Sequence, residues 1–150
     1  MPEPSNVFNI ARILLIEDNP DDAEWVRRVF QRGHLGNPLA VIEDGAKALD
    51  VLSRSANDPS GPAFDLVLLD LTLPGLDGRT LLKHFAEDRR LRKIPVIVLT
   101  GSQREEDMVS AYKTGAVAFL RKPIDMERFL GIVGDLYGNR LYIVRQPESD

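Results

Sequence analysis

The chain contains no cysteine among its 150 residues. This absence excludes disulfides, thiolate metal sites and thiol nucleophiles, and it fits a reducing compartment. Long apolar runs are also missing, since no stretch approaches the roughly 20 apolar residues that cross a bilayer. Residues 1–9 have neither the basic start nor the apolar core of a signal peptide. We therefore expect a cytoplasmic protein with no membrane association.

A surplus of basic charge is missing as well. The chain has 19 Lys and Arg against 23 Asp and Glu, a formal net charge of −4, and its basic residues are scattered. Nucleic-acid binders usually gather Lys and Arg on one face, so we expect no nucleic-acid partner. The two histidines, His34 and His84, have no partner at metal-ligand spacing and are expected at the surface or its boundary.

The length and the apolar content of 43% are sufficient for one domain with a buried core. Apolar, strand-like runs alternate with amphipathic segments. Strands are expected at 12–16, 39–42, 66–70, 94–100 and 116–120, and helices at 20–33, from about 45 to 52, at 79–87, 105–114 and 126–137. Five strand-then-helix units predict an α/β fold, with a parallel sheet covered by helices on both faces.

The first of these helices has a clear start signal. Asn19 is a suitable N-cap, Pro20 suits the first helical position, and Asp21 and Asp22 fall in the first turn. We interpret the two aspartates as partners of the helix dipole rather than as ligands.

Polar residues stand where four of the expected strands end. The apolar run 66–69 ends abruptly in Asp70, and an isolated aspartate there could simply be a turn residue. However, the strand at 12–16 ends in Glu17 and Asp18, the fourth strand ends in Thr100, and the fifth is followed by Lys122. Because the carboxyl ends of parallel strands share one edge of a sheet, we expect these residues to meet there.

Three carboxylates, a hydroxyl and an ammonium group suit phosphoryl chemistry. The repulsion between the acids is relieved by raised pKa values or by a hard divalent cation, for which Mg²⁺ is the natural candidate. Asp70 could then attack a phosphoryl group and form an aspartyl phosphate. Lys122 could pair with the phosphoryl oxygens, and the Thr100 hydroxyl could donate a hydrogen bond to one of them.

This set of residues resembles that of response-regulator receiver domains, the phosphoacceptors of two-component signalling. The resemblance covers the expected domain at 11–137, with 1–10 as a lead-in and 138–150 as a C-terminal extension. It implies a flavodoxin-like (CheY-like) sheet of five parallel strands in the order 2-1-3-4-5. It also implies a phosphoacceptor rather than a classical enzyme, with a histidine kinase as its partner.

The same resemblance assigns roles to individual residues. It implies Mg²⁺ (or Mn²⁺) held by Glu17, Asp18, Asp70 and the backbone carbonyl of Thr72, with Asp70 as the phosphorylated residue. Thr100 and Phe119 correspond to the switch residues, where Phe119 replaces the more familiar Tyr. Lys122 corresponds to the phosphate-contacting lysine, and the Lys122-Pro123 bond to the family's cis peptide.

The stretch LLIEDNPDDAEWVRRVF at 14–30 is most similar to single-domain regulators paired with phytochrome-type histidine kinases. Without an effector domain, the signal would leave through a change of surface. An apolar run at 141–144 follows the last expected helix, which contains Gly131 and Gly134. We therefore expect a homodimer through the segments 105–114, 116–120, 126–137 and 138–150.

Two other classes fit the residues less well. A haloacid-dehalogenase-like phosphatase would need a second acid two residues after its nucleophile, where this chain has Thr72. A flavodoxin-like module for a nucleotide or flavin would need a Gly, Ser or Thr loop after the first strand, whereas Glu17, Asp18 and Asp21 would repel a phosphate that lacks a metal.

Overall fold

The computed structural model describes residues 11–59, 63–71, 78–101, 104 and 118–137 of the chain. The strands are β1 (Ile13–Ile16), β2 (Leu39–Ile42), β3 (Leu66–Asp70), β4 (Val96–Thr100) and β5 (Ala118–Arg121). The helices are α1 (Pro20–Arg32), α2 (Gly45–Ala56), α3 (Gly78–Glu87) and α5 (Met126–Tyr137), with a short 3₁₀ helix, η2 (Leu91–Lys93). All strand pairs are parallel and the order is β2-β1-β3-β4-β5, which confirms the predicted sheet.

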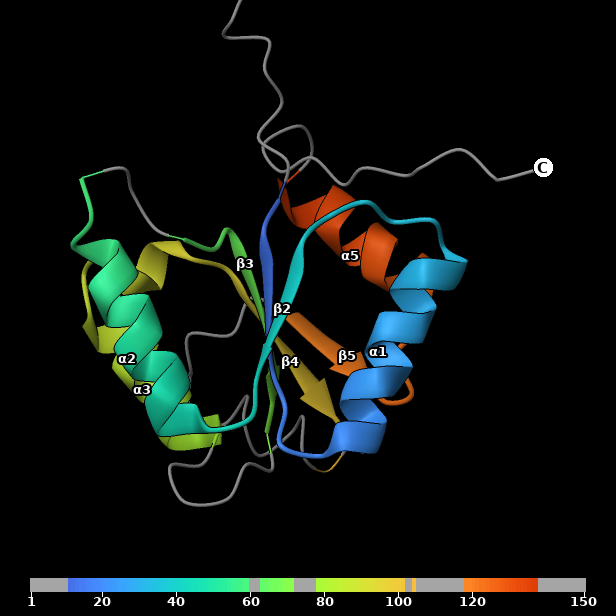
Figure 1. Ribbon diagram of the computed structural model, residues 1–150, viewed down its shortest axis with the longest axis horizontal. Helices are drawn as coiled ribbons and strands as arrows, with labels where there is room; N and C mark the ends of the chain where they lie inside the picture. The colour runs from blue at the N-terminus through green and yellow to red at the C-terminus, as the bar shows by residue number, and fades with distance from the viewer. Residues whose placement is uncertain (1–10, 60–62, 72–77, 102–103, 105–117, 138–150) are drawn as a thin grey trace, which may run out of the picture.

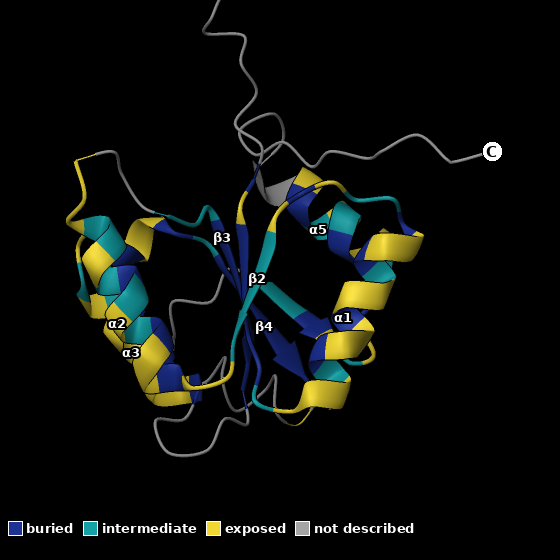
Figure 2. Ribbon diagram, in the orientation of Figure 1, coloured by how far each residue is buried: buried dark blue, intermediate teal, exposed yellow. Residues whose placement is uncertain are grey.

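The sheet is covered on both faces (Figure 1): α2 and α3 lie on one side, α1 and α5 on the other. Successive residues of β1 alternate between these sides. Leu14 and Ile16 belong to the core beneath α2 and α3, while Ile13 and Leu15 belong to the core beneath α1 and α5. Both cores are apolar, which explains why the central strands read as continuous apolar runs. Figure 2 shows the buried residues along the sheet and on the inner faces of the helices.

The start of α1 follows the predicted capping chemistry. The side chain of Asn19 accepts hydrogen bonds from the backbone N–H groups of Asp21, at 2.8 Å, and Asp22, at 3.2 Å. Pro20 occupies the first turn, where its missing N–H costs nothing. Asp44 caps α2 in the same way through the N–H of Ala46 at 2.8 Å. These caps fix where each helix leaves the end of the preceding strand.

Most predicted boundaries hold to within one residue, but α2 runs to Ala56, four residues beyond its predicted end, because Ala56 still packs against the core beneath α2 and α3. β4 begins at Val96 rather than at residue 94, because the chain first forms η2, whose turn is closed by a bond from the Ile94 N–H to the Leu91 carbonyl at 2.9 Å. β5 reaches Arg121, one residue further than predicted, because Arg121 pairs with Thr100. The helix predicted at 105–114 and the segments 1–10 and 138–150 lie outside the described residues.

The described helices include none that is long and apolar enough to span a bilayer. His84 is exposed and His34 is half-buried, as the sequence predicted.

Candidate functional site

The pairing register brings the predicted polar residues to one edge of the sheet. Ile16 pairs with Leu69, so Glu17 and Asp70, the next residues of their chains, emerge side by side. Asp70 pairs with Leu99 on β4, and Thr100 pairs with Arg121, which precedes Lys122. The shared edge that was predicted from the strand ends is therefore confirmed, as open parallel sheets require.

Glu17, Asp18 and Asp70 form an acidic cluster. Each offers a carboxylate oxygen, and these atoms lie within 4.8 Å of one another. Glu17 and Asp70 are almost fully buried, with 1% and 3% of their surface exposed. Three converging carboxylates suit a hard divalent cation such as Mg²⁺ or Mn²⁺, which prefers oxygen ligands. The donor set therefore fits the predicted metal.

Burial, together with the neighbouring Asp70, raises the pKa of Glu17 from 4.5 to about 8, although Lys122 acts in the opposite direction. The cause is mainly desolvation, since a buried carboxylate without sufficient counter-charge favours its neutral form. Without a metal, Glu17 therefore carries a proton at neutral pH. A cation in the cluster would compete with that proton.

The ammonium group of Lys122 lies among carboxylates. Its Nζ is 2.9 Å from Asp22 Oδ2, 3.0 Å from Glu17 Oε1 and 3.3 Å from Asp70 Oδ2. Burial alone would lower the pKa of Lys122, but the hydrogen bonds with Asp22 and Glu17 and the charge of Asp70 outweigh it and raise this pKa above its ordinary value. Lys122 is therefore a permanent cation beside Asp70. The cis Lys122-Pro123 bond is present, as predicted.

Asp22 is the site residue that the sequence analysis missed. It was interpreted only as a partner of the helix dipole, yet its carboxylate accepts a hydrogen bond from Lys122 across 100 positions of sequence. The available signal was positional: α1 starts four residues after β1 ends, so its first turn lies over the same edge of the sheet. Sequence alone gives no rotational setting of that turn, so it could not separate Asp22 from Asp21.

Thr100 and Phe119 occupy different environments. Thr100 is fully buried, and its hydroxyl oxygen has no hydrogen-bond partner among the described residues. A buried hydroxyl without a partner is costly, and an added ligand oxygen would remove that cost. Phe119 is half-buried and packs against the core beneath α2 and α3. Thr72, the fourth predicted metal ligand, lies outside the described residues.

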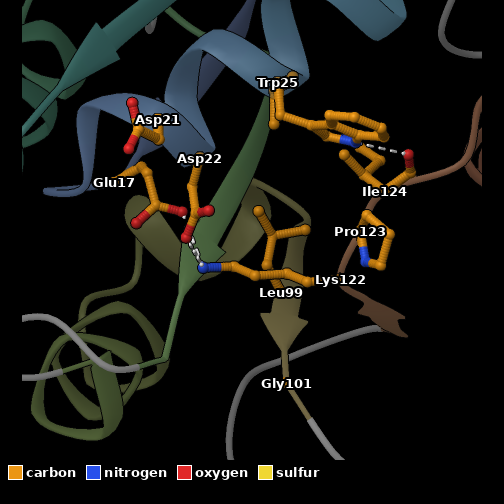
Figure 3. A pocket seen from close by; sticks show the side chains of 10 residues that line it. Glu17, Asp21, Asp22, Trp25, Leu99, Gly101, Lys122, Pro123 and Ile124 are labelled. Atoms are coloured by element: carbon orange, nitrogen blue, oxygen red, sulfur yellow. Dashed lines mark hydrogen bonds and ion pairs between the residues drawn. The ribbon is translucent and has the colours of Figure 1, made fainter.

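A hollow of about 490 Å³ opens beside these groups (Figure 3). Acids of α1 and Lys122 form its polar wall, and Trp25, Leu99, Pro123 and Ile124 form its apolar wall. The indole N–H of Trp25 donates a hydrogen bond to the carbonyl of Ile124 at 3.1 Å. Trp25 is 42% exposed, so the single tryptophan of the chain can report on this region by fluorescence.

Comparison with known proteins gives one consistent family. A profile described as the response regulator receiver domain matches residues 13–133. Response regulator Rcp1 of Synechocystis is 32% identical over 137 residues, which cover 91% of this chain and 93% of Rcp1. The probable methanogenesis regulatory protein FilR2 of Methanothrix harundinacea is 38% identical over 116 residues, which cover 77% of this chain and 74% of FilR2.

Among solved structures, the bacteriophytochrome response regulator AtBRR is 36% identical with a TM-score of 0.79, covering 97% of this chain and 100% of that one. The Mn²⁺-bound form of Rcp1 is 28% identical with a TM-score of 0.66, covering 89% and 99%. The phosphorylated cyanobacterial phytochrome response regulator RcpA is 27% identical with a TM-score of 0.67, covering 89% and 98%.

Proposed function

The chain belongs to the response regulator receiver family, the phosphoryl-accepting regulators of two-component signalling, and on that premise we propose that Asp70 accepts the phosphoryl group. One observation carries the assignment. Asp70 ends the central strand β3, is nearly fully buried, shares the acidic cluster with Glu17 and Asp18, and lies 3.3 Å from the Lys122 ammonium group. A carboxylate in that position can be both a nucleophile and part of a charged cradle.

In the proposed reaction, one oxygen of the Asp70 carboxylate attacks the phosphorus atom of a phosphohistidine. An O–P bond forms, the P–N bond breaks, and its electron pair stays on the ring nitrogen of the kinase histidine. Lys122 stabilises the negative charge on the phosphoryl oxygens. The buried Thr100 hydroxyl donates to one of these oxygens and so gains the partner that it lacks.

Receiver domains bind Mg²⁺ or Mn²⁺ at their acidic pocket, and here we assign that site to Glu17, Asp18 and Asp70, with Thr72 contributing a backbone carbonyl. When bound, the ion offsets the charge of the carboxylates and of the incoming phosphoryl group. Glu17 must give up its proton for this site to form, since its pKa is about 8 without a metal. Asp18 and Asp70 supply the remaining carboxylate oxygens.

The output is a change of surface that starts from Thr100 and Phe119. Phosphorylation adds about −1.5 to −2 charges next to Thr100. Movement of the Thr100 side chain toward the phosphoryl group lets the half-buried Phe119 ring turn inward, which shifts a pre-existing equilibrium of the output face. Because Phe119 has no hydroxyl, its outward state cannot donate a hydrogen bond to a partner.

The proposed partners follow from the family and from two of the similar solved structures. A histidine kinase supplies the phosphoryl group, and we propose a phytochrome-type kinase because AtBRR and RcpA are phytochrome response regulators by name. The protein acts as a phosphoacceptor that takes part in its own phosphorylation rather than as a classical enzyme. A cytoplasmic location and the absence of a nucleic-acid partner stay predictions from composition.

A homodimer through the segments 105–114, β5, α5 and 138–150 is also proposed. Two features of the described part support it: β5 is an edge strand, and a Cβ added at Gly131 or Gly134 of α5 would meet nothing within 4 Å. A partner helix could therefore approach α5 closely. Sedimentation of the full chain and of a version ending at Tyr137 tests this, and two identical monomeric masses would contradict it.

The assignment of Asp70 is tested by intact-mass analysis with acetyl phosphate, with and without Mg²⁺. The wild type should gain one phosphate only with Mg²⁺, and Asp70→Asn should gain none. Asp65→Asn is a matched control, because Asp65 precedes β3, at the opposite end of that strand, where it pairs with Arg12 at 3.0 Å. Phosphate gain by Asp70→Asn, or its loss in Asp65→Asn at a temperature where that variant is folded, would refute the assignment.

A further inference from the structure

We infer that Asp22 is a positioning residue for phosphoryl transfer: from the first turn of α1, it holds the Lys122 ammonium group beside Asp70. The inference deepens the proposed function and rests on Asp70 being the phosphoacceptor. Asp22 Oδ2 accepts a hydrogen bond from Lys122 Nζ at 2.9 Å, the shortest of the three carboxylate contacts of that ammonium group. Figure 3 shows the Asp22 and Glu17 side chains converging on Lys122 Nζ.

The three carboxylates around Lys122 have different proposed roles. Glu17 and Asp70 belong to the acidic cluster that fits a divalent cation, and Asp70 is also the proposed site of phosphorylation. A bound cation and the phosphoryl group would therefore compete with Lys122 for these two carboxylates. Asp22 is outside that cluster. It is the carboxylate that can keep its contact with Lys122 while the other two engage the metal and the phosphoryl group.

Lys122 needs such a contact because its side chain is long and flexible. Four rotatable bonds separate its backbone from its charge, and fixing them costs conformational entropy. The backbone is already fixed, since the Lys122 N–H donates to the Thr100 carbonyl at 2.7 Å. The Lys122 side chain as a whole is 24% exposed, so packing alone does not hold it. Asp22 supplies the second point of attachment.

A second contact from the same helix supports this role. Trp25 lies one turn after Asp22 on α1, and its indole N–H donates to the carbonyl of Ile124, two residues beyond Lys122. α1 therefore holds both the tip of the Lys122 side chain and the backbone that follows it. Together these contacts keep Nζ within 3.3 Å of Asp70 Oδ2.

The chain offers a matched control in Asp21. Asp21 and Asp22 both lie in the first turn of α1 and line the same hollow. Asp21→Asn and Asp22→Asn therefore each remove one negative charge near the N-terminus of α1 and near the path of an anionic phosphodonor. Only Asp22 has a hydrogen bond to Lys122. The difference between the two variants isolates the positioning effect from long-range electrostatics.

The experiment measures the rate of phosphate gain from acetyl phosphate at saturating Mg²⁺ by intact mass. We expect Asp22→Asn to react about three- to fivefold more slowly than Asp21→Asn, in the range for a partly exposed ion pair. Mg²⁺ affinity, followed by Trp25 fluorescence, should be the same in both variants. Asp22→Glu, which keeps a carboxylate, should recover part of the rate. In a Lys122→Met background, adding Asp22→Asn or Asp21→Asn should have equal effects.

The positioning role is overturned if Asp22→Asn reacts as fast as Asp21→Asn or faster, or if its deficit persists without Lys122. A deficit that comes entirely from weaker Mg²⁺ binding would also overturn it. These results differ from a failure of the proposed function. If the wild type gains no phosphate, or Asp70→Asn still gains it, both proposals fail. If Asp70 is the acceptor and the two aspartate variants match, only the role of Asp22 fails.

Discussion

Mg²⁺ affinity should depend steeply on pH, because one of the proposed ligands is protonated in the metal-free protein. Burial first, and then the proximity of Asp70, raise the pKa of Glu17 to about 8. A metal ligand must be deprotonated, so metal binding releases that proton. Lowering the pH below 8 therefore weakens apparent binding, whereas raising it above 8 brings the affinity to a plateau.

The magnitude follows from the titration of a single group. With a pKa of about 8, roughly one tenth of Glu17 is ionised at pH 7. The apparent affinity at pH 7 should then be roughly tenfold below its plateau, and each further unit of acid should cost about another tenfold. At pH 7, roughly 0.9 protons should be released for each Mg²⁺ bound.

Isothermal titration calorimetry in two buffers of different ionisation enthalpy measures both the affinity and the proton release. Trp25 fluorescence gives an independent binding curve, since this side chain lines the hollow beside the acids. Glu17→Gln should bind more weakly but without pH dependence between about pH 6 and 9. Asp18→Asn should also bind more weakly and keep the pH dependence. Constant wild-type affinity over this range, with no proton release, would refute the reasoning.

Three further predictions concern stability. In EDTA the free energy of unfolding should fall by up to a few kcal/mol as the pH rises from 4.5 toward 8, because the folded protein binds more protons at Glu17 than the unfolded chain in this window. Thermal unfolding with excess Mg²⁺ should show a smaller fall. A rise of this free energy in EDTA would contradict the raised pKa of Glu17. Gly78→Ala should lower the free energy of unfolding by roughly 1–3 kcal/mol and slow phosphorylation, because the new Cβ would lie 2.7 Å from the Leu71 carbonyl oxygen and 2.9 Å from that of Asp70. A Cβ at Gly134 would meet nothing within 4 Å. Gly134→Ala should therefore stabilise the monomer by about 0.5–1 kcal/mol and weaken the proposed dimer in sedimentation. Phe129→Ala should lower stability by about 3–5 kcal/mol in urea unfolding, since Phe129 is fully buried against the Phe30 ring at 5.3 Å between centroids; a loss below 1 kcal/mol would contradict that packing.

Most of the fold could be predicted because local signals and the global architecture agree. Apolar runs such as 66–69 are fully buried on both faces of the sheet, and Asn19 caps α1 where a cap was expected. The start of β4 was harder to predict from the sequence. Ile94 is buried and apolar like a strand residue, but the chain closes a 3₁₀ turn there first, and composition alone does not distinguish these two environments.

The site was predictable to the extent that it depends on topology. Glu17, Asp70 and Thr100 could be brought together from their places at strand ends, because register and parallel pairing leave little freedom there. The contact of Asp22 with Lys122 depends instead on the rotation of α1 and on the rotamers of a long side chain. Neither quantity has a periodic signature in sequence, and the helix-dipole interpretation was sufficient for any first-turn aspartate.

The buried polar groups show where this fold gives up stability for chemistry. Among the described residues, four polar side chains are buried: Glu17, Asn37, Asp70 and Thr100. Asn37 has a structural explanation, since its side-chain amide donates to the Ala11 carbonyl at 2.8 Å. The other three gather at one edge, with a raised pKa at Glu17 and an unpartnered hydroxyl at Thr100. A cation and a phosphoryl group would relieve both costs, so binding energy and the stability of the folded state should rise together at this edge.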